Sequence, residues 1–250
     1  MLKTRVIPTI LWNGASSVKG EQFNTWRNLG PIGPAINIYV ARDVDEIFLI
    51  NLAPHKIGGE IDYQGIKRFF SKCNLPLTYG GGIKNEEQVE RLLECGVDKI
   101  SLNSVTYKNK DFVSSITKKY GSQFVVVSID YKAINGKLIC FSNRGQINEG
   151  IELTDHLSDL SGCNMGELML TCIDTEGTME GYETTGVSAI RDLVNIPIII
   201  SGGAGNLKHF ETALVAGADA LAASSAFLFT EITPKKVKEH LKSRGHEVRL

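Results

Sequence analysis

The sequence offers little that points to a secreted, metal-binding or membrane-spanning protein. Its five cysteines are odd in number and scattered without C-x-x-C spacing, which argues against a disulfide framework and a structural zinc site. No apolar run approaches the roughly 20 residues that a membrane-spanning helix needs, and the N-terminus lacks a signal-peptide pattern. We therefore expect a cytoplasmic protein whose thiols are buried.

A dominant charge of one sign is also absent. The chain has 27 Lys and Arg against 28 Asp and Glu, so no bulk field favours nucleic acid or an anionic membrane, and any anion site must be local. The five histidines show no metal-ligand spacing, and no motif indicates nicotinamide, flavin or metal. We expect no cofactor.

What the chain does have is a regular alternation of apolar runs and segments of helical period. Such alternation indicates a parallel sheet buried on both faces, and eight such units are typical of a (β/α)8 TIM barrel. We expect one barrel domain over residues 1–250, with a doubly wound open sheet as the alternative. The expected strands are 5–11, 46–51, 75–79, 99–103, 124–130, 167–172, 196–201 and 220–225.

Local signals place helices and loops between these strands. Asn85 is an expected N-cap and Gly96 a C-terminal stop, and the segment 206–217 has the same design. Glycines and prolines predict a loop at 28–37, and we expect a hairpin-bearing loop at 133–150.

The chain also repeats itself at a constant offset of 121 residues. A self-similar half of four βα units implies two related half-barrels, with two related sites facing each other across one mouth. The offset pairs Glu46 with Glu167, Pro76 with Pro197, Gly81 with Gly202, Gly82 with Gly203, Gly96 with Gly217 and Asp98 with Asp219.

Glycine loops follow the third and seventh expected strands at matched places. In a parallel α/β fold the carboxyl ends of the strands form the active face, where glycines let backbone N–H groups approach a phosphate. Tight turns explain one such loop equally well, but two loops in symmetric positions favour phosphate binding. We expect a ligand with two phosphates, held by Gly81, Gly82 and Asn103 at one end and by Gly202, Gly203 and Ser224 at the other.

These residues make the chain resemble a known family, the cyclase subunit of imidazole glycerol phosphate synthase. The resemblance covers nearly the whole chain, and its motifs are specific in combination. They are "RVIP", "PLTYGGGIKN", "DKISLNS", "VVVSIDYK", "TEGTMEGYE", "IPIIISGGAGN" and "ALAASS". The resemblance implies a (β/α)8 barrel that receives ammonia from a glutaminase partner.

The resemblance also implies two catalytic carboxylates, of which this chain keeps one. The carboxylate at the end of the fifth strand is Asp130, but Leu11 stands where the family has an aspartate at the end of the first strand. Leucine cannot transfer a proton, and one member of such a pair contributes about 10²- to 10⁴-fold in rate. Asn51 and the segment 142–146 depart from the family pattern as well. The family's ring closure is therefore in question here.

Other positions keep residues that could touch the ligand. Lys19 matches a mobile, substrate-contacting lysine of the family, although a solvated lysine is the plainer alternative. Thr171, Asp174, Glu176 and Thr178 follow the sixth strand and could contact substrate or phosphate, while an Asx-type turn explains the acids about as well.

At the opposite end of the barrel, four charged residues match the ammonia gate of the family. They are Arg5, Glu46, Lys99 and Glu167, each at the start of an expected strand. Charges that point into a barrel are costly unless they are paired, so a role in stability alone is the weaker explanation. Asp98, beside them, matches a family residue that faces the glutaminase.

Three functions fit this pattern. The first is a paralogue that docks a glutaminase and conducts ammonia to another acceptor, as in conversion of an acetamido group on a surface sugar to an acetamidino group. The second is the histidine-pathway cyclase itself, with a substitute carboxylate near Leu11, for which Asp174 is the candidate. The third is a non-catalytic partner that activates a glutaminase and forms a tunnel to a separate ATP-using enzyme.

Overall fold

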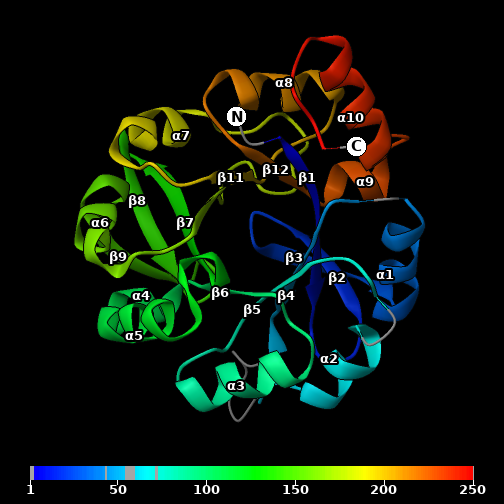
Figure 1. Cartoon of the computed structure of the whole chain (residues 1–250). Helices are drawn as coiled ribbons and strands as arrows, with labels where there is room; N and C mark the ends of the chain where they lie inside the picture. Colours follow the sequence, from blue (N-terminus) through cyan, green and yellow to red (C-terminus); the bar gives the residue numbers. More distant parts are fainter. Residues whose placement is uncertain (1–2, 43, 54–59, 71–72, 250) are drawn as a thin grey trace.

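Eight parallel strands close into a barrel in the computed structural model of the chain, which describes residues 3–42, 44–53, 60–70 and 73–249 (Figure 1). In hydrogen-bonded order they are β1 (Arg5–Trp12), β4 (Ile47–Asn51), β5 (Leu77–Gly80), β6 (Lys99–Leu102), β7 (Val125–Ile134), β10 (Glu167–Cys172), β11 (Ile198–Ser201) and β12 (Ala220–Ala223), which pairs with β1 again. The predicted (β/α)8 fold is confirmed.

Helices follow the strands and cover the outside of the barrel (Figure 1). They are α1 (Ile32–Ala41), α2 (Tyr63–Phe70), α3 (Glu86–Glu94), α4 (Ser104–Lys108), α5 (Lys110–Tyr120), α6 (Leu153–Asp159), α7 (Thr185–Ile190), α8 (Leu207–Val215), α9 (Ser225–Phe229) and α10 (Pro234–Ser243). Within the described segments no helix is long and apolar enough to cross a membrane.

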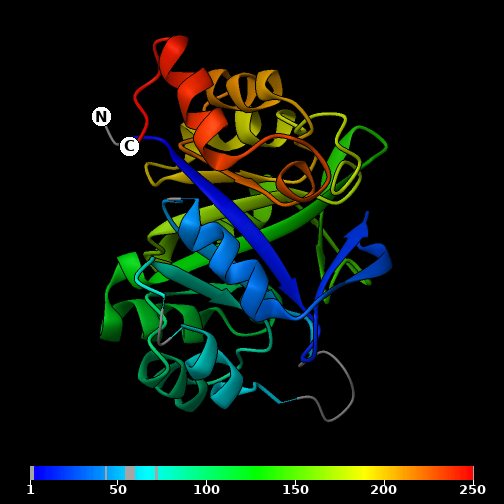
Figure 2. The same ribbon diagram turned by 90° about the vertical axis from the view of Figure 1, so that its right-hand side faces the viewer.

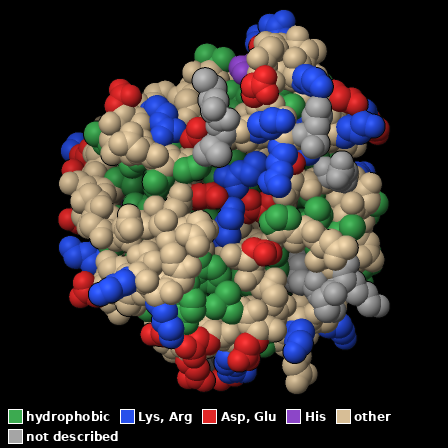
Figure 3. Space-filling view, in the orientation of Figure 1, with side chains coloured by type: hydrophobic (Ala, Val, Ile, Leu, Met, Phe, Trp, Pro, Cys, Tyr) green, Lys and Arg blue, Asp and Glu red, His purple; other side chains and the backbone are tan. Residues whose placement is uncertain are grey.

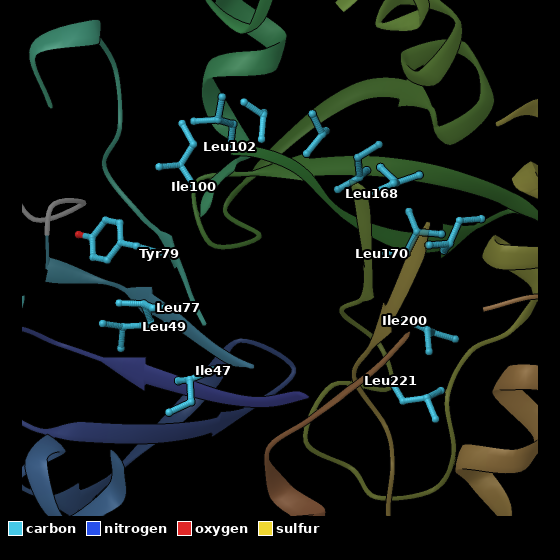
Figure 4. Close-up of a cluster of buried hydrophobic side chains, with 14 of the residues drawn as sticks. Ile47, Leu49, Leu77, Tyr79, Ile100, Leu102, Leu168, Leu170, Ile200 and Leu221 are labelled. Atoms are coloured by element: carbon cyan, nitrogen blue, oxygen red, sulfur yellow. The ribbon is translucent and has the colours of Figure 1, made fainter. Parts of the chain in front are cut away.

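Alternate strand residues face either the helices or the barrel axis, because successive side chains in a strand point to opposite faces. The helix-facing set forms the larger apolar cluster, and Figure 4 shows part of it on β4, β5, β6, β10, β11 and β12. A smaller cluster fills the inside of the barrel: Ile7, Phe48, Val126, Met169, Ile199, Ala220 and Ala222. Both faces of the strands are therefore apolar, as the uninterrupted apolar runs indicate.

Two hairpins extend the barrel at the carboxyl ends of its strands. One is formed by β2 (Ser17–Glu21) and β3 (Asn24–Gly30), and Figure 2 shows it at the end of the barrel opposite to the two chain termini. The other is formed by β8 (Lys137–Ser142) and β9 (Ile147–Glu152), which confirms the hairpin expected within 133–150.

The loop expected at 28–37 is wrong, because β3 extends to Gly30 and α1 begins at Ile32. Pro31 is the N-cap of this helix and Pro34 lies in its first turn. Proline is tolerated there because the first N–H groups of a helix have no partner within the helix. Proline content therefore indicated a loop where the chain starts a helix.

The local signals of the repeat are confirmed at both helices. The side chain of Asn85 accepts a hydrogen bond from the backbone N–H of Gln88, and Asn206 accepts one from the N–H of His209 at the start of α8. Gly96 and Gly217 end the two helices in left-handed conformations, with φ of 87° and 104°. The two halves thus begin and end these helices in the same way.

Candidate active site and charged ring

The amino ends of four barrel strands bring together Arg5, Glu46, Lys99 and Glu167, which we call the charged ring. The Arg5 guanidinium lies 2.7 Å from a Glu46 oxygen and 2.8 Å from a Glu167 oxygen. The Lys99 ammonium lies 3.1 Å from Glu46 and 2.8 Å from Glu167. The two cations and two carboxylates therefore alternate in a closed circuit. Figure 3, which views this end of the barrel, shows basic and acidic side chains gathered near its centre.

Mutual pairing keeps Arg5 and Glu167 charged. Burial alone would raise the pKa of Glu167, but Arg5 and Lys99 outweigh it and hold that pKa below its ordinary value. Burial likewise opposes the charge of Arg5, whose pKa is nevertheless raised by Glu167 and Glu46. A hydroxyl hydrogen of Thr78 adds a further hydrogen bond to Glu46. The structure thus holds together all four residues that the sequence selected.

Asp98 lies beside the ring and has a counterpart in two other places around the barrel. Asp98, Asp45 and Asp219 each accept a hydrogen bond from a backbone N–H near the start of a neighbouring strand. Asp45 also pairs with Lys238 at 2.7 Å, and Asp219 pairs with Arg191 at 2.6 Å. Within the described part of the chain, the exposed Asp98 has no such cation. Its charge is open to a partner.

At the other end of the barrel, Asp130 forms the centre of a polar group. The Asn103 amide donates a hydrogen bond of 2.8 Å to the Asp130 carboxylate, and Thr171 lies next to Asp130 in the register of β10 with β7. Burial raises the pKa of Asp130 to about 7, the Glu176 carboxylate adds to this shift, and the Asn103 hydrogen bond opposes it. A carboxyl group near neutrality can both take up and release a proton.

Lys19 and Glu176 form a buried ion pair beside Asp130. Lys19 comes from the β2–β3 hairpin and is 2% exposed, so the solvated alternative is wrong. Within the described segments of the chain, one buried oxygen of Glu176 has no hydrogen-bond partner. The pair borders a pocket that is also lined by Thr9, Leu11, Gly202, Gly203, Ser224 and Ser225. The second glycine loop, Lys19 and the unusual Leu11 therefore share one pocket.

The first glycine loop has a different environment. A Cβ atom added at Gly81 would lie 2.0 Å from the backbone oxygen of Asn51, and Gly81 and Gly82 have φ of 112° and 78°. Close packing and left-handed backbone therefore require glycine at Gly81, whatever the loop binds. The side chain of Asn51 bonds to the hydroxyl of Tyr79. The structure places this loop at the mouth but outside the pocket that holds Leu11.

Asp174 does not take the place that the sequence gave it as a substitute carboxylate near Leu11. Its side chain accepts a hydrogen bond from the backbone N–H of Ala133 at 3.0 Å, and its carbonyl accepts one from Gln22. The turn that contains Asp174 and Glu176 places Glu176, instead of Asp174, in the pocket. Glu176 is therefore the second carboxylate at this mouth.

Two further polar groups line the pocket: Thr9, which sequence reasoning missed, and Ser225. The hydroxyls of Thr9 and Ser225 are buried and have no hydrogen-bond partner among the described residues. Thr9 precedes Leu11 by two positions on β1, so alternation in the strand was the available signal. Among the described residues, no His, Cys, Asp and Glu side chains group in a way that could hold a metal ion.

Comparison with known proteins shows the family of this chain. Residues 5–233 match the model of a family described as "Histidine biosynthesis protein". The chain is 36% identical over 251 residues to the imidazole glycerol phosphate synthase subunit HisF of Flavobacterium johnsoniae, covering all of both chains. The chain belongs to the HisF family.

Other members of the HisF family match over the same length. The chain is 40% identical over 250 residues to a Campylobacter jejuni protein provisionally named imidazole glycerol phosphate synthase subunit hisF2, covering all of both chains. It is 35% identical over 250 residues to HisF of Thermotoga sp. strain RQ2, covering all of this chain and 99% of the relative. The family resemblance is thus confirmed along the whole chain.

Proposed function

We propose that this HisF-family chain receives ammonia from a glutaminase subunit and passes it through the barrel to an acceptor outside the histidine pathway. The proposed acceptor is an acetamido group on a surface sugar, which becomes an acetamidino group after activation by a separate ATP-using enzyme. The observation that carries the proposal is the combination of a complete charged ring with Leu11 in the pocket at the mouth.

The charged ring supports entry of ammonia at the amino ends of the strands. Four charges, of which Glu46 is buried and the other three are partly buried, lie at the axis, where apolar residues would form an equally stable plug. Movement of the Lys99 side chain away from Glu46 and Glu167 would open the circuit, because it breaks two pairs at once. A glutaminase docked over this end, with Asp98 at the contact, would deliver ammonia directly to the ring.

The mouth supports binding of a phosphorylated ligand. Lys19, Gly202, Gly203 and Ser224 line one pocket, and Gly81, Gly82 and Asn103 lie at the matched place in the other half. We propose a ligand with two phosphates, bound as substrate or effector. In crystals soaked with inorganic phosphate, we expect a phosphate ion at each of the two glycine loops. A phosphate at only one loop would contradict the symmetric arrangement.

The second candidate function is the histidine-pathway cyclase. The position of Glu176 favours it, because this carboxylate lines the pocket that holds Leu11 and raises the pKa of Asp130. Glu176 pairs with Lys19, whereas Asp130 is half-buried and accepts a hydrogen bond from Asn103. Two carboxyl groups in different environments can divide acid and base roles.

One assay separates the two candidates. The chain is mixed with ammonium salt and the histidine-pathway ribonucleotide intermediate, and loss of the intermediate is followed beside a Leu11→Asp variant. We expect the Leu11→Asp variant to turn over the intermediate about 10²- to 10⁴-fold faster than the unaltered chain, the contribution of one acid or base group. Turnover by the unaltered chain that disappears in Glu176→Gln would favour the cyclase.

A matched variant tests whether this barrel makes any bond. Asp130→Asn retains the size of the side chain and removes its titration. Loss of ligand-dependent chemistry in Asp130→Asn would mean catalysis in the barrel. Unchanged transfer of ammonia to the ATP-using enzyme would mean that the chain acts as a conduit, a role we expect in the cytoplasm.

A further inference from the structure

Helix α1 lies on the outside of the barrel and has no charged side chain (Figure 1). Its sequence is IGPAINIYVA, whereas the other described helices of eight or more residues each carry charged residues. A surface helix normally places polar and charged residues on the side that faces water. The outer side of α1 therefore lacks the usual adaptation to water.

The short helix α9 continues this apolar surface. The rings of Tyr39 on α1 and Phe227 on α9 meet edge to face with their centroids 6.4 Å apart, and Figure 1 shows the two helices side by side. Exposed apolar residues flank this contact in both helices, and we call them the lateral patch. They are Ile38, Val40, Leu228 and Phe229, with exposed fractions of 49%, 38%, 38% and 46%. Large apolar residues gathered in this way are typical of a contact surface.

The internal repeat provides a comparison within the same chain. At the offset of 121 residues, α6 is the counterpart of α1, and α4 is the counterpart of α9. The residues that pack on the barrel are apolar and buried in both halves. They are Ile32, Ile36 and Tyr39 in one half and Leu153, Leu157 and Leu160 in the other.

The outward residues of the two halves differ. Pro34 and Ile38 correspond to exposed aspartates, and Phe229 corresponds to an exposed lysine. These counterparts are Asp155, Asp159 and Lys108. The same elements therefore fold on the barrel with charged residues at these positions. Packing within the chain explains the buried residues, whereas the exposed apolar residues of the lateral patch indicate a contact outside the chain.

A second copy of the chain is the partner that fits this patch. Two copies related by a two-fold axis place the same surface against itself, so a surface of one charge would repel its copy. The lateral patch has no charge, and the segments that carry it are followed by Arg42 and by Glu231, one charge of each sign. Figure 1 shows α1 and α9 on the outer circumference of the barrel, so a glutaminase centred on the charged ring would leave this side accessible.

We propose that the chain forms a two-fold dimer through the lateral patch, with α1 and α9 of one copy packed against those of the other. This dimer goes beyond the proposed function and depends neither on ammonia nor on an acceptor. It leaves the charged ring of each copy open, so the complex with the glutaminase would contain two barrels and two glutaminases.

Sedimentation of the full chain over a range of concentrations tests the proposal. We expect a dimer that dissociates on dilution. Ile38→Asp gives α1 the residue that α6 carries at the equivalent position, so the helix should still form, as circular dichroism would check. The two-fold axis would then bring two unpaired carboxylates into the interface. We expect dimerisation to weaken by at least about 100-fold.

Two further variants make this test specific. Phe229→Lys transfers the residue of the other half in the same way and should also weaken dimerisation. Val215→Glu is the matched control, because Val215 is exposed and apolar, has Glu94 as its counterpart and lies outside the lateral patch. We expect it to leave dimerisation unchanged.

Three results would overturn the dimer. The first is a monomer at every concentration, and the second is a dimer that persists in both Ile38→Asp and Phe229→Lys. The third is a monomeric chain that binds to vesicles of anionic phospholipid and loses this binding in Ile38→Asp, which would mean that a membrane surface covers the lateral patch. Sedimentation needs no acceptor, so failure of the dimer and failure of the proposed function are distinguishable.

Discussion

At the scale of single residues, the clearest expectation concerns the titration of Asp130. Its pKa is raised from 3.8 to about 7 by burial and by Glu176, while Asn103 opposes the shift. Glu176→Gln should therefore lower this pKa, and Asn103→Leu should raise it. Carboxyl ¹³C NMR titration measures both, and a shift in the same direction for the two variants would contradict the assignment of causes.

The raised pKa also fixes the sign of the pH dependence of stability. Between pH 4 and 7, roughly, folded Asp130 holds a proton that the unfolded chain has released, so the folded state binds more protons. The contribution of Asp130 to the free energy of unfolding is thus present at low pH and is lost as pH rises through this window. Denaturant unfolding of Asp130→Asn should show a flatter pH profile than that of the unaltered chain.

Sequence reasoning reached some of these residues and missed others for a physical reason. Asp130 ends a recognisable strand and has a match in the family. Thr9 is a single small polar residue in an apolar strand whose two faces are both buried, so its residue type alone could not tell the barrel interior from the helix side. Asp174 and Glu176 lie in one turn, and the path of that turn decides which carboxylate enters the pocket.

At the scale of secondary structure elements, the repeat predicts that the N-caps of α3 and α8 stabilise the two halves equally. Asn85→Ala and Asn206→Ala each remove a side-chain acceptor from the first turn of a helix. Each should lower the free energy of unfolding by about 1 kcal/mol, and the double variant by the sum, because the sites are separate. Asn→Ser at either position retains an acceptor and serves as the control in denaturant unfolding. Strongly unequal losses would argue against equivalent halves.

The same elements show where local signals suffice. N-caps and stop glycines depend on neighbours in sequence, so they predicted α3 and α8 closely. The start of α1 depends on how Pro31 and Pro34 are used, and proline favours both loops and first turns of helices. Composition alone could not decide between these two uses.

At the scale of the whole molecule, the charged ring and Asp98 predict which end of the barrel meets the glutaminase. Asp98→Asn keeps an oxygen that can accept the strand N–H but removes the charge, so it should leave stability unchanged. We expect it to weaken binding of the glutaminase by about tenfold, the effect of losing one charge-assisted contact, as measured by titration calorimetry.

The matched variant is Asp219→Asn, at the equivalent place in the other half. The Asp219 charge already pairs with Arg191 within the chain, so its loss should affect stability more than binding. Similar losses of affinity in both variants would mean that the charge of this whole end attracts the partner, rather than Asp98 itself. A loss of affinity confined to Asp98→Asn would indicate that the glutaminase docks on the first half-barrel. The two aspartates are otherwise equivalent and differ in whether their own chain supplies a cation.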